Sequence, residues 1–157
     1  MKHTLSVLVE NRAGVLSKIT ALFARRGFNI DSLAVGETDK HDVSSMTIVS
    51  TGDERTIDQI EKQLNKKPDV IKVRRLEEAK AVELEMMLLK VSCSATSRTS
   101  LIELCSVMGA KIVHVSARHM IIELEKDPAS LDEFVTLCKP FGILEVQRTG
   151  TIAMSKK

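Results

Sequence analysis

The sequence predicts an α+β protein built from two tandem ferredoxin-like domains, each ordered strand, helix, strand, strand, helix, strand. Short segments with alternating apolar residues predict the strands, and segments with apolar residues at helical spacing predict the helices. This order of elements occurs twice in the 157 residues, although the two copies share no clear sequence repeat. A charged, alanine-rich segment at residues 77–82 separates the copies, so we expect domains at residues 1–77 and 83–157.

The first domain begins with a strand that is followed directly by an amphipathic helix. Leu5, Val7 and Val9 alternate with polar residues, and apolar residues recur at helical spacing from Val15 to Phe23. The following elements are expected in order: a helix end at Gly27, a strand at residues 28–35, a strand at 44–50, a helix opened by the capping-box pair Thr51 and Glu54 and ended by Pro68, and a strand at 70–76.

The second domain repeats the plan. Its expected elements are a strand at residues 85–93, a helix at 96–109, strands at 111–117 and 120–125, a helix opened by Asp127-Pro128, and a strand at 143–148 that Thr149-Gly150 interrupts before residues 152–154. The first of these strands is apolar on both faces at Met86-Met87-Leu88-Leu89. We therefore expect the other domain or another chain to cover it, and we expect self-association.

Composition argues against nucleic-acid and membrane partners. The chain has 23 Lys and Arg against 21 Asp and Glu, interspersed and without a long basic run. It has four Phe and neither Trp nor Tyr, so it lacks the aromatic platform on which RNA-binding members of this fold stack bases. No apolar stretch is long enough to span a bilayer and no leader is visible, so we expect a cytoplasmic protein.

No residue pattern indicates a catalytic or metal centre. Cys93, Cys105 and Cys138 are odd in number and widely spaced, without a CxxC motif, which argues against disulfides and metal ligands. Cys105 and Cys138 lie on the apolar stripes of predicted helices, so we expect these two to be core thiols. The four histidines show no HExxH spacing, and no serine lies in GxSxG. The sequence therefore favours a regulatory or interaction protein over an enzyme.

The start of the first helix is the candidate ligand site. Gly14 lies at the turn, where no side chain shields the backbone N–H groups of Gly14, Val15 and Leu16 at the positive end of the helix dipole. A small carboxylate suits such a site, and Asn11 offers both a donor and an acceptor for the same ligand. The alternative remains open that Asn11 only ends the strand and that Gly14 only makes a tight turn.

Several segments resemble those of one family. The stretches ENRAGVL at residues 10–16 and RRGFNIDSLAVG at 25–36 resemble an ACT domain, the amino-acid-sensing module. With SSMTIVSTGDE at 44–54, DQIEKQLNKKPDVIKV at 58–73 and PFGILEVQRTGTIAMS at 140–155, nearly the whole chain resembles the regulatory (small) subunit of acetolactate synthase.

The resemblance implies a non-catalytic subunit of branched-chain amino-acid biosynthesis, with no cofactor of its own. It implies a catalytic (large) partner subunit that holds thiamine diphosphate, Mg and FAD, which this chain would activate and make sensitive to feedback inhibition by valine. It also implies a homodimer of ACT domains with the effector between them. The implied ligand-binding residues are Asn11, Ala13, Gly14, Val15 and Leu16 from one chain, with Asn29 and Ile30 from the other.

A second interpretation remains open at this point. The same site would serve a stand-alone ACT-type sensor or scaffold that binds an amino acid and partners another enzyme. Valine and leucine differ by one methylene, which changes binding in an apolar pocket by only about 1–3 kcal/mol. The choice among branched-chain effectors therefore does not follow from the sequence.

Overall fold

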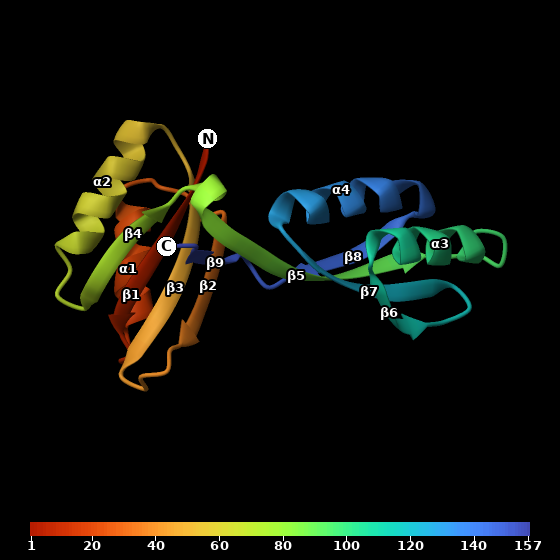
Figure 1. The fold of residues 1–157 in the computed structure, drawn as a ribbon, viewed down its shortest axis with the longest axis horizontal. Helices are drawn as coiled ribbons and strands as arrows, with labels where there is room; N and C mark the ends of the chain where they lie inside the picture. The colour runs from red at the N-terminus through yellow and green to blue at the C-terminus, as the bar shows by residue number, and fades with distance from the viewer. The chain divides into compact units, whose positions relative to one another are not determined.

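A computed structural model describes all 157 residues and divides them into two compact units. The first unit contains Met1–Glu83 together with Thr151–Lys157, and the second contains Leu84–Gly150. Each unit is a sheet with two helices on one face, so the α+β prediction of two βαββαβ-like units is confirmed (Figure 1).

The first unit follows the predicted order of elements. They are β1 (Lys2–Glu10), α1 (Val15–Arg25), β2 (Ser32–Glu37), β3 (Val43–Thr51), α2 (Glu54–Asn65) and β4 (Val70–Leu76). The strands form an antiparallel sheet in the order β2-β3-β1-β4, and α1 and α2 cover one face of it (Figure 1). Alternate apolar residues of β1 and β3 pack against the apolar faces of both helices and form one buried core.

Two details of the first unit differ from the prediction. β2 begins at Ser32 and not at Phe28, because Phe28 packs edge-on against Phe23, with ring centroids 6.5 Å apart, at the end of α1. The capping box at Thr51 is wrong: Asp53 is the N-cap of α2 and accepts a hydrogen bond from Thr56 N at 2.7 Å. Thr51 ends β3 instead, and its hydroxyl donates to Asp31 at 2.6 Å.

The last strand packs on the first unit, although we expected residues 83–157 to form one domain. β9 (Ile152–Ser155) pairs with β5 and lies against the face of the first sheet that the helices leave open (Figure 1). Ala153 N donates to Thr47 Oγ1 at 3.3 Å, and Lys156 N donates to Lys80 O at 2.9 Å. Thr47 and Val49 on this open face are only 5% and 8% exposed. Contacts distant in sequence therefore assign residues 151–157 to the first unit.

The second unit has the sheet order β6-β7-β5-β8. Its elements are β5 (Ala81–Ser92), which begins in the first unit after the short helix η1 (Glu78–Lys80), then α3 (Arg98–Met108), β6 (Lys111–Val115), β7 (His119–Lys126), α4 (Pro128–Cys138), η2 (Lys139–Phe141) and β8 (Ile143–Arg148). Met87 and Leu89 are fully buried beneath the helices, whereas Met86 and Leu88 on the other face are 39% and 41% exposed in the single chain.

The three cysteines lie in the core of the second unit, as was predicted for Cys105 and Cys138. Cys93, Cys105 and Cys138 carry free, buried thiols. Burial, with a smaller contribution from Cys105, raises the pKa of Cys138 to about 12. No group of three or more His, Cys, Asp or Glu side chains is arranged to hold a metal ion. No helix has the length and apolar character needed to cross a bilayer.

Candidate ligand site at the start of the first helix

Gly14 is the N-cap of α1 and makes the turn that the sequence predicted. Its φ of 85° lies in the left-handed region, and no side chain caps the helix. Val15 N donates to Arg12 O at 3.3 Å, so this amide is used by the turn. The amides of Gly14, Leu16 and Ser17 have no acceptor within the chain. The helix therefore presents three open N–H groups. Those of Gly14 and Leu16 were predicted, whereas that of Ser17 was not.

Asn11 is held by the loop between β2 and β3. Its side-chain amide donates to His41 O at 2.8 Å and to Glu37 Oε2 at 3.4 Å, and its backbone N donates to Asp42 O at 2.8 Å. Glu37 also pairs with the ring of His41. These bonds use the donors of the Asn11 side chain and leave Oδ1 as an acceptor. The geometry thus suits an ammonium group beside Asn11 better than a carboxylate.

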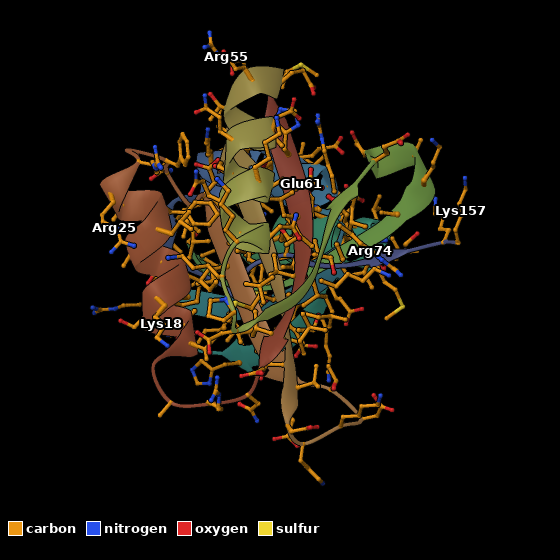
Figure 2. All side chains as sticks on the ribbon, turned by 90° about the vertical axis from the view of Figure 1, so that its left-hand side faces the viewer. Lys18, Arg25, Arg55, Glu61, Arg74 and Lys157 are labelled. Atoms are coloured by element: carbon orange, nitrogen blue, oxygen red, sulfur yellow. The ribbon has the colours of Figure 1, made fainter.

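An ion-pair cluster fixes the turn from the other side. Asp69, which precedes β4, is 3% exposed and accepts from Arg12 Nη2 at 2.6 Å and from Lys18 Nζ at 3.0 Å. Arg12 also pairs with Glu10. Figure 2 shows Lys18 on α1 close to the loop that precedes the helix. Because Asp69 O accepts from Glu10 N at 2.9 Å, one residue ties the end of β1 to both cations.

The charges of this cluster stabilise the ionised form of Asp69. Hydrogen bonding to Lys18, and then to Arg12, holds the pKa of Asp69 below its ordinary value against the opposing effect of desolvation. The carboxylate engages two of the cations nearest to the start of α1. The open amides of the helix are anion-binding groups that the fold itself leaves unused at this turn.

The remaining predicted residues separate into two groups. Ala13 and Gly14 are exposed, Leu16 is 42% exposed, and Val15 is buried in the core beneath the turn. Asn29 and Ile30 follow the other end of α1, and eleven helical residues place them about 16 Å along the helix axis from Gly14. One chain therefore does not bring Asn29 and Ile30 to the start of its own helix.

Asn29 is positioned by hydrogen bonds of its own turn. Its side-chain amide donates to Asp31 Oδ1 at 2.6 Å, and its carbonyl accepts from Ser50 Oγ at 2.6 Å. Asp31 also accepts from Thr51, and this bond, followed by that from Asn29, holds its pKa below the ordinary value. The segment is thus tied to the end of β3.

Comparisons with known proteins place these two units in a family. Residues 5–72 match the family model described as the small subunit-like ACT domain of AHAS, and residues 84–157 match the model described as the small subunit of acetolactate synthase. The acetolactate synthase small subunit of Mycolicibacterium smegmatis is 44% identical over 154 residues, covering 98% of this chain and 91% of that protein. The chain belongs to the acetolactate synthase small-subunit family.

Other members of the small-subunit family agree in sequence and in structure. The acetolactate synthase small subunit of Mycobacterium leprae is 40% identical, covering 98% of this chain and 91% of the relative. The crystal structure of the small subunit from Thermotoga maritima matches with a TM-score of 0.90 and 37% identity, covering 100% of this chain and 98% of that chain. The resemblance found in the sequence is therefore confirmed.

Sequence reasoning missed three contributors to this site. Ser17 carries an open amide, and it could have been found by counting the four unpaired N–H groups of a helix start. Asp69 and Glu37 lie far from the turn in sequence. Their contacts depend on how β4 and the β2–β3 loop pack beside β1, and no local pattern indicates this.

Proposed function

We propose that the chain is the non-catalytic regulatory subunit of acetolactate synthase. The chain binds the catalytic subunit, raises the activity of that subunit and makes it sensitive to feedback inhibition by valine. The catalytic subunit holds thiamine diphosphate, Mg and FAD. The observation that carries the proposal is the full-length similarity to acetolactate synthase small subunits, 44% identical over 98% of the chain. The site at the start of α1 supports the valine part of the proposal.

The open amides supply a place for the carboxylate of valine. A carboxylate on the N–H groups of Gly14, Leu16 and Ser17 would gain charge-assisted hydrogen bonds of roughly 1.5–3 kcal/mol each. The helix dipole would add about 0.3–1 kcal/mol. The ammonium group of the same ligand suits Asn11 Oδ1, and its apolar side chain suits the exposed part of Leu16.

A homodimer would complete the site. Asn29 and Ile30 lie at the far end of α1 from Gly14, so a second chain is needed to supply them to the same ligand. β2 is an edge strand of the first sheet, and its Val35 side chain is 45% exposed. Edge strands with exposed apolar residues favour pairing with another chain. Ligand binding and dimer geometry would then be linked, which allows an effector to act on a distant partner.

The decisive experiment mixes the purified chain with the acetolactate synthase catalytic subunit from the same source. We expect acetolactate formation to rise on mixing and to fall again when valine is added. The catalytic subunit alone is the control. No association and no change in rate would reject the regulatory proposal. Valine binding without association would favour the stand-alone sensor.

Binding at the helix start is tested by Gly14→Asp with Gly14→Asn as its matched control. Asp and Asn have similar size and both tolerate the left-handed conformation better than most residues. Only Asp places a negative charge at the proposed carboxylate site. We expect Gly14→Asp to lose the thermal stabilisation by valine and Gly14→Asn to keep part of it. At 100 times the dissociation constant, this stabilisation is about 2.7 kcal/mol in the unaltered chain. Equal responses in both variants would remove the carboxylate from this position.

A further inference from the structure

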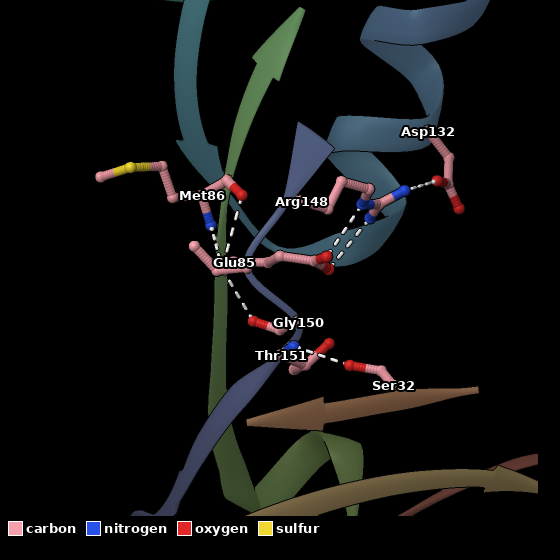
Figure 3. Close-up of polar contacts among 8 residues, drawn as sticks. Ser32, Glu85, Met86, Asp132, Arg148, Gly150 and Thr151 are labelled. Atoms are coloured by element: carbon pink, nitrogen blue, oxygen red, sulfur yellow. Dashed lines mark hydrogen bonds and ion pairs between the residues drawn. The ribbon is translucent and has the colours of Figure 1, made fainter. Parts of the chain in front are cut away.

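Arg148, the last residue of β8, is held firmly within the second unit. Its Nε and Nη2 donate to the two carboxylate oxygens of Glu85 at 2.9 and 3.0 Å, and its Nη1 donates to Asp132 at 2.6 Å (Figure 3). The side chain of Glu85 is only 6% exposed. Paired bonds of this geometry fix both the position and the direction of the guanidinium group.

The next residue is tied to the same strand. Met86 N donates to Thr149 Oγ1 at 3.1 Å, and Thr149 N donates to Met86 O at 3.1 Å. Gly150 follows with a φ of 87°, a conformation that favours glycine. Residues 148 and 149 are therefore anchored to β5 up to the point where the chain enters the first unit.

Immediately after Gly150, the chain is anchored to the first unit. Thr151 N donates to Ser32 Oγ at 2.8 Å, and Thr151 is 3% exposed (Figure 3). Ser32 begins β2 and directly follows Asn29, Ile30 and Asp31. The segment proposed to touch the effector is therefore connected to the anchored residues of β8 by one hydrogen bond and four consecutive residues of the chain.

We propose that the hydrogen bond between Ser32 and Thr151 couples amino-acid binding at the first unit to the packing of β8 in the second unit. The inference rests on the proposed function, because it requires an effector at Asn29 and Ile30. A ligand that moves this segment also moves Ser32, and Thr151 transmits the change to Thr149 and Arg148. A coupling of this kind needs an element whose arrangement both sites influence, and residues 148–151 are that element.

Hydrogen–deuterium exchange of the full chain, with and without saturating valine, tests the coupling. Peptides covering residues 11–18 and 27–33 report on binding, and peptides covering 84–92 and 143–150 report on the second unit. In the unaltered chain we expect valine to slow exchange in both sets. In Ser32→Ala, which removes the acceptor, we expect slowing in the first set to remain. The factor by which valine slows exchange in the second set of peptides should fall about fivefold. One neutral hydrogen bond changes an equilibrium constant by about this factor.

Two further variants sharpen the test. Thr47→Val removes the acceptor that holds Ala153 and is expected to weaken the same response, so the inference does not depend on one variant. Ser45→Ala is the matched control, because Ser45 lies on the same face of β3 without a hydrogen bond to β9, and it should behave as the unaltered chain.

The outcomes separate the two proposals. If valine slows exchange in neither set, effector binding and the proposed valine response are rejected. Slowing confined to residues 11–18 and 27–33 in the unaltered chain rejects the coupling and leaves effector binding intact. An unchanged response of residues 84–92 and 143–150 in both Ser32→Ala and Thr47→Val also rejects the coupling.

Discussion

Replacement of Arg148 by Met is expected to destabilise the second unit strongly. The substitution keeps an unbranched side chain of similar length and removes the guanidinium group. The carboxylate of Glu85, whose side chain is 6% exposed, then loses both hydrogen bonds from the guanidinium group. Removal of one partner from a buried ion pair is costly because the remaining charge has lost both water and its counterion.

The contacts of Arg148 set the size of this effect. Stranding one member of a buried pair costs about 3–5 kcal/mol. The side chain of Arg148 is 29% exposed, so water reaches the site and places the expected loss near the lower limit, about 3 kcal/mol. The side chain of Asp132 is 61% exposed, and its ion pair contributes less than about 1 kcal/mol. For a unit of this size, the loss corresponds to a decrease of about 12–24 °C in melting temperature.

The free energy of unfolding is measured from the exchange of β5 amides at Met87 and Leu89, which report on the second unit alone. The matched control is the double variant Arg148→Met with Glu85→Leu. Replacing both members of a buried pair by apolar residues of similar size is often nearly neutral, so the double variant should recover most of the loss. Asp132→Asn should cost less than about 1 kcal/mol.

Two results would refute this reasoning. A loss below about 1 kcal/mol in Arg148→Met would mean that the ion pair of Arg148 with Glu85 does not behave as a buried pair. A double variant as unstable as the single variant would mean that the loss comes from packing, and not from the stranded carboxylate.

Three other predictions concern the caps, the turn and the thiols. Asp127→Ala should lower the urea midpoint by the equivalent of about 1 kcal/mol, because Asp127 caps α4, and Asp127→Asn should keep most of the stability. Since Lys18 and Arg12 lower the pKa of Asp69, its carboxylate stabilises the fold above about pH 4, and this stabilisation is lost as pH falls through the lowered pKa. The difference in urea midpoint between the unaltered chain and Asp69→Asn should therefore shrink on acidification below pH 4, and a constant difference would contradict it. A thiol reagent at pH 8 should react with Cys138 only after the chain unfolds, because burial raises its pKa to about 12; rapid labelling of the folded chain would contradict this.

The sequence predicted the elements whose signals are local. The bounds of β4 and β8 agree with the expected strands, and Asp127 caps α4 as its spacing before the helix indicated. β2 was predicted to begin too early, because the alternation of Phe28 and Ile30 resembles a strand. Those two side chains pack against the core from a turn instead.

The return of β9 to the first unit could not be predicted from its pattern. In Ile152-Ala153-Met154, alternation would turn the two large residues toward a core. The structure shows the reverse: Ile152 and Met154 are 60% and 75% exposed, and Ala153 approaches Thr47. A small residue permits this close backbone contact. One of the contacts that hold β9 there is a hydrogen bond to a hydroxyl group on β3, more than a hundred residues away in sequence.

The candidate site also combines a feature with a local sequence signal and contacts between residues distant in sequence. The turn at Gly14 was predicted because the strand end, the glycine and the helix start are adjacent in sequence, and its φ of 85° shows that the turn needs a residue that adopts this conformation. The donors of Asn11 were assigned to a ligand, whereas the structure uses them on the β2–β3 loop. The β2–β3 loop comes into contact with Asn11 only when β2 and β3 pair with each other, so the sequence near Asn11 does not indicate this contact.

β2 connects the two halves of the proposed mechanism. Its outer edge and the exposed Val35 face a partner chain in the proposed dimer, and its first residue, Ser32, anchors β9 through Thr151. An effector that orders Asn29 and Ile30 therefore acts on a strand that is bonded on one side to the core strand β3. The same strand leads through Thr151 to residues clamped by Glu85 in the second unit. Because β3 restrains one side of β2, the proposed coupling requires a shift of Ser32 to reach Thr151 through their hydrogen bond at 2.8 Å.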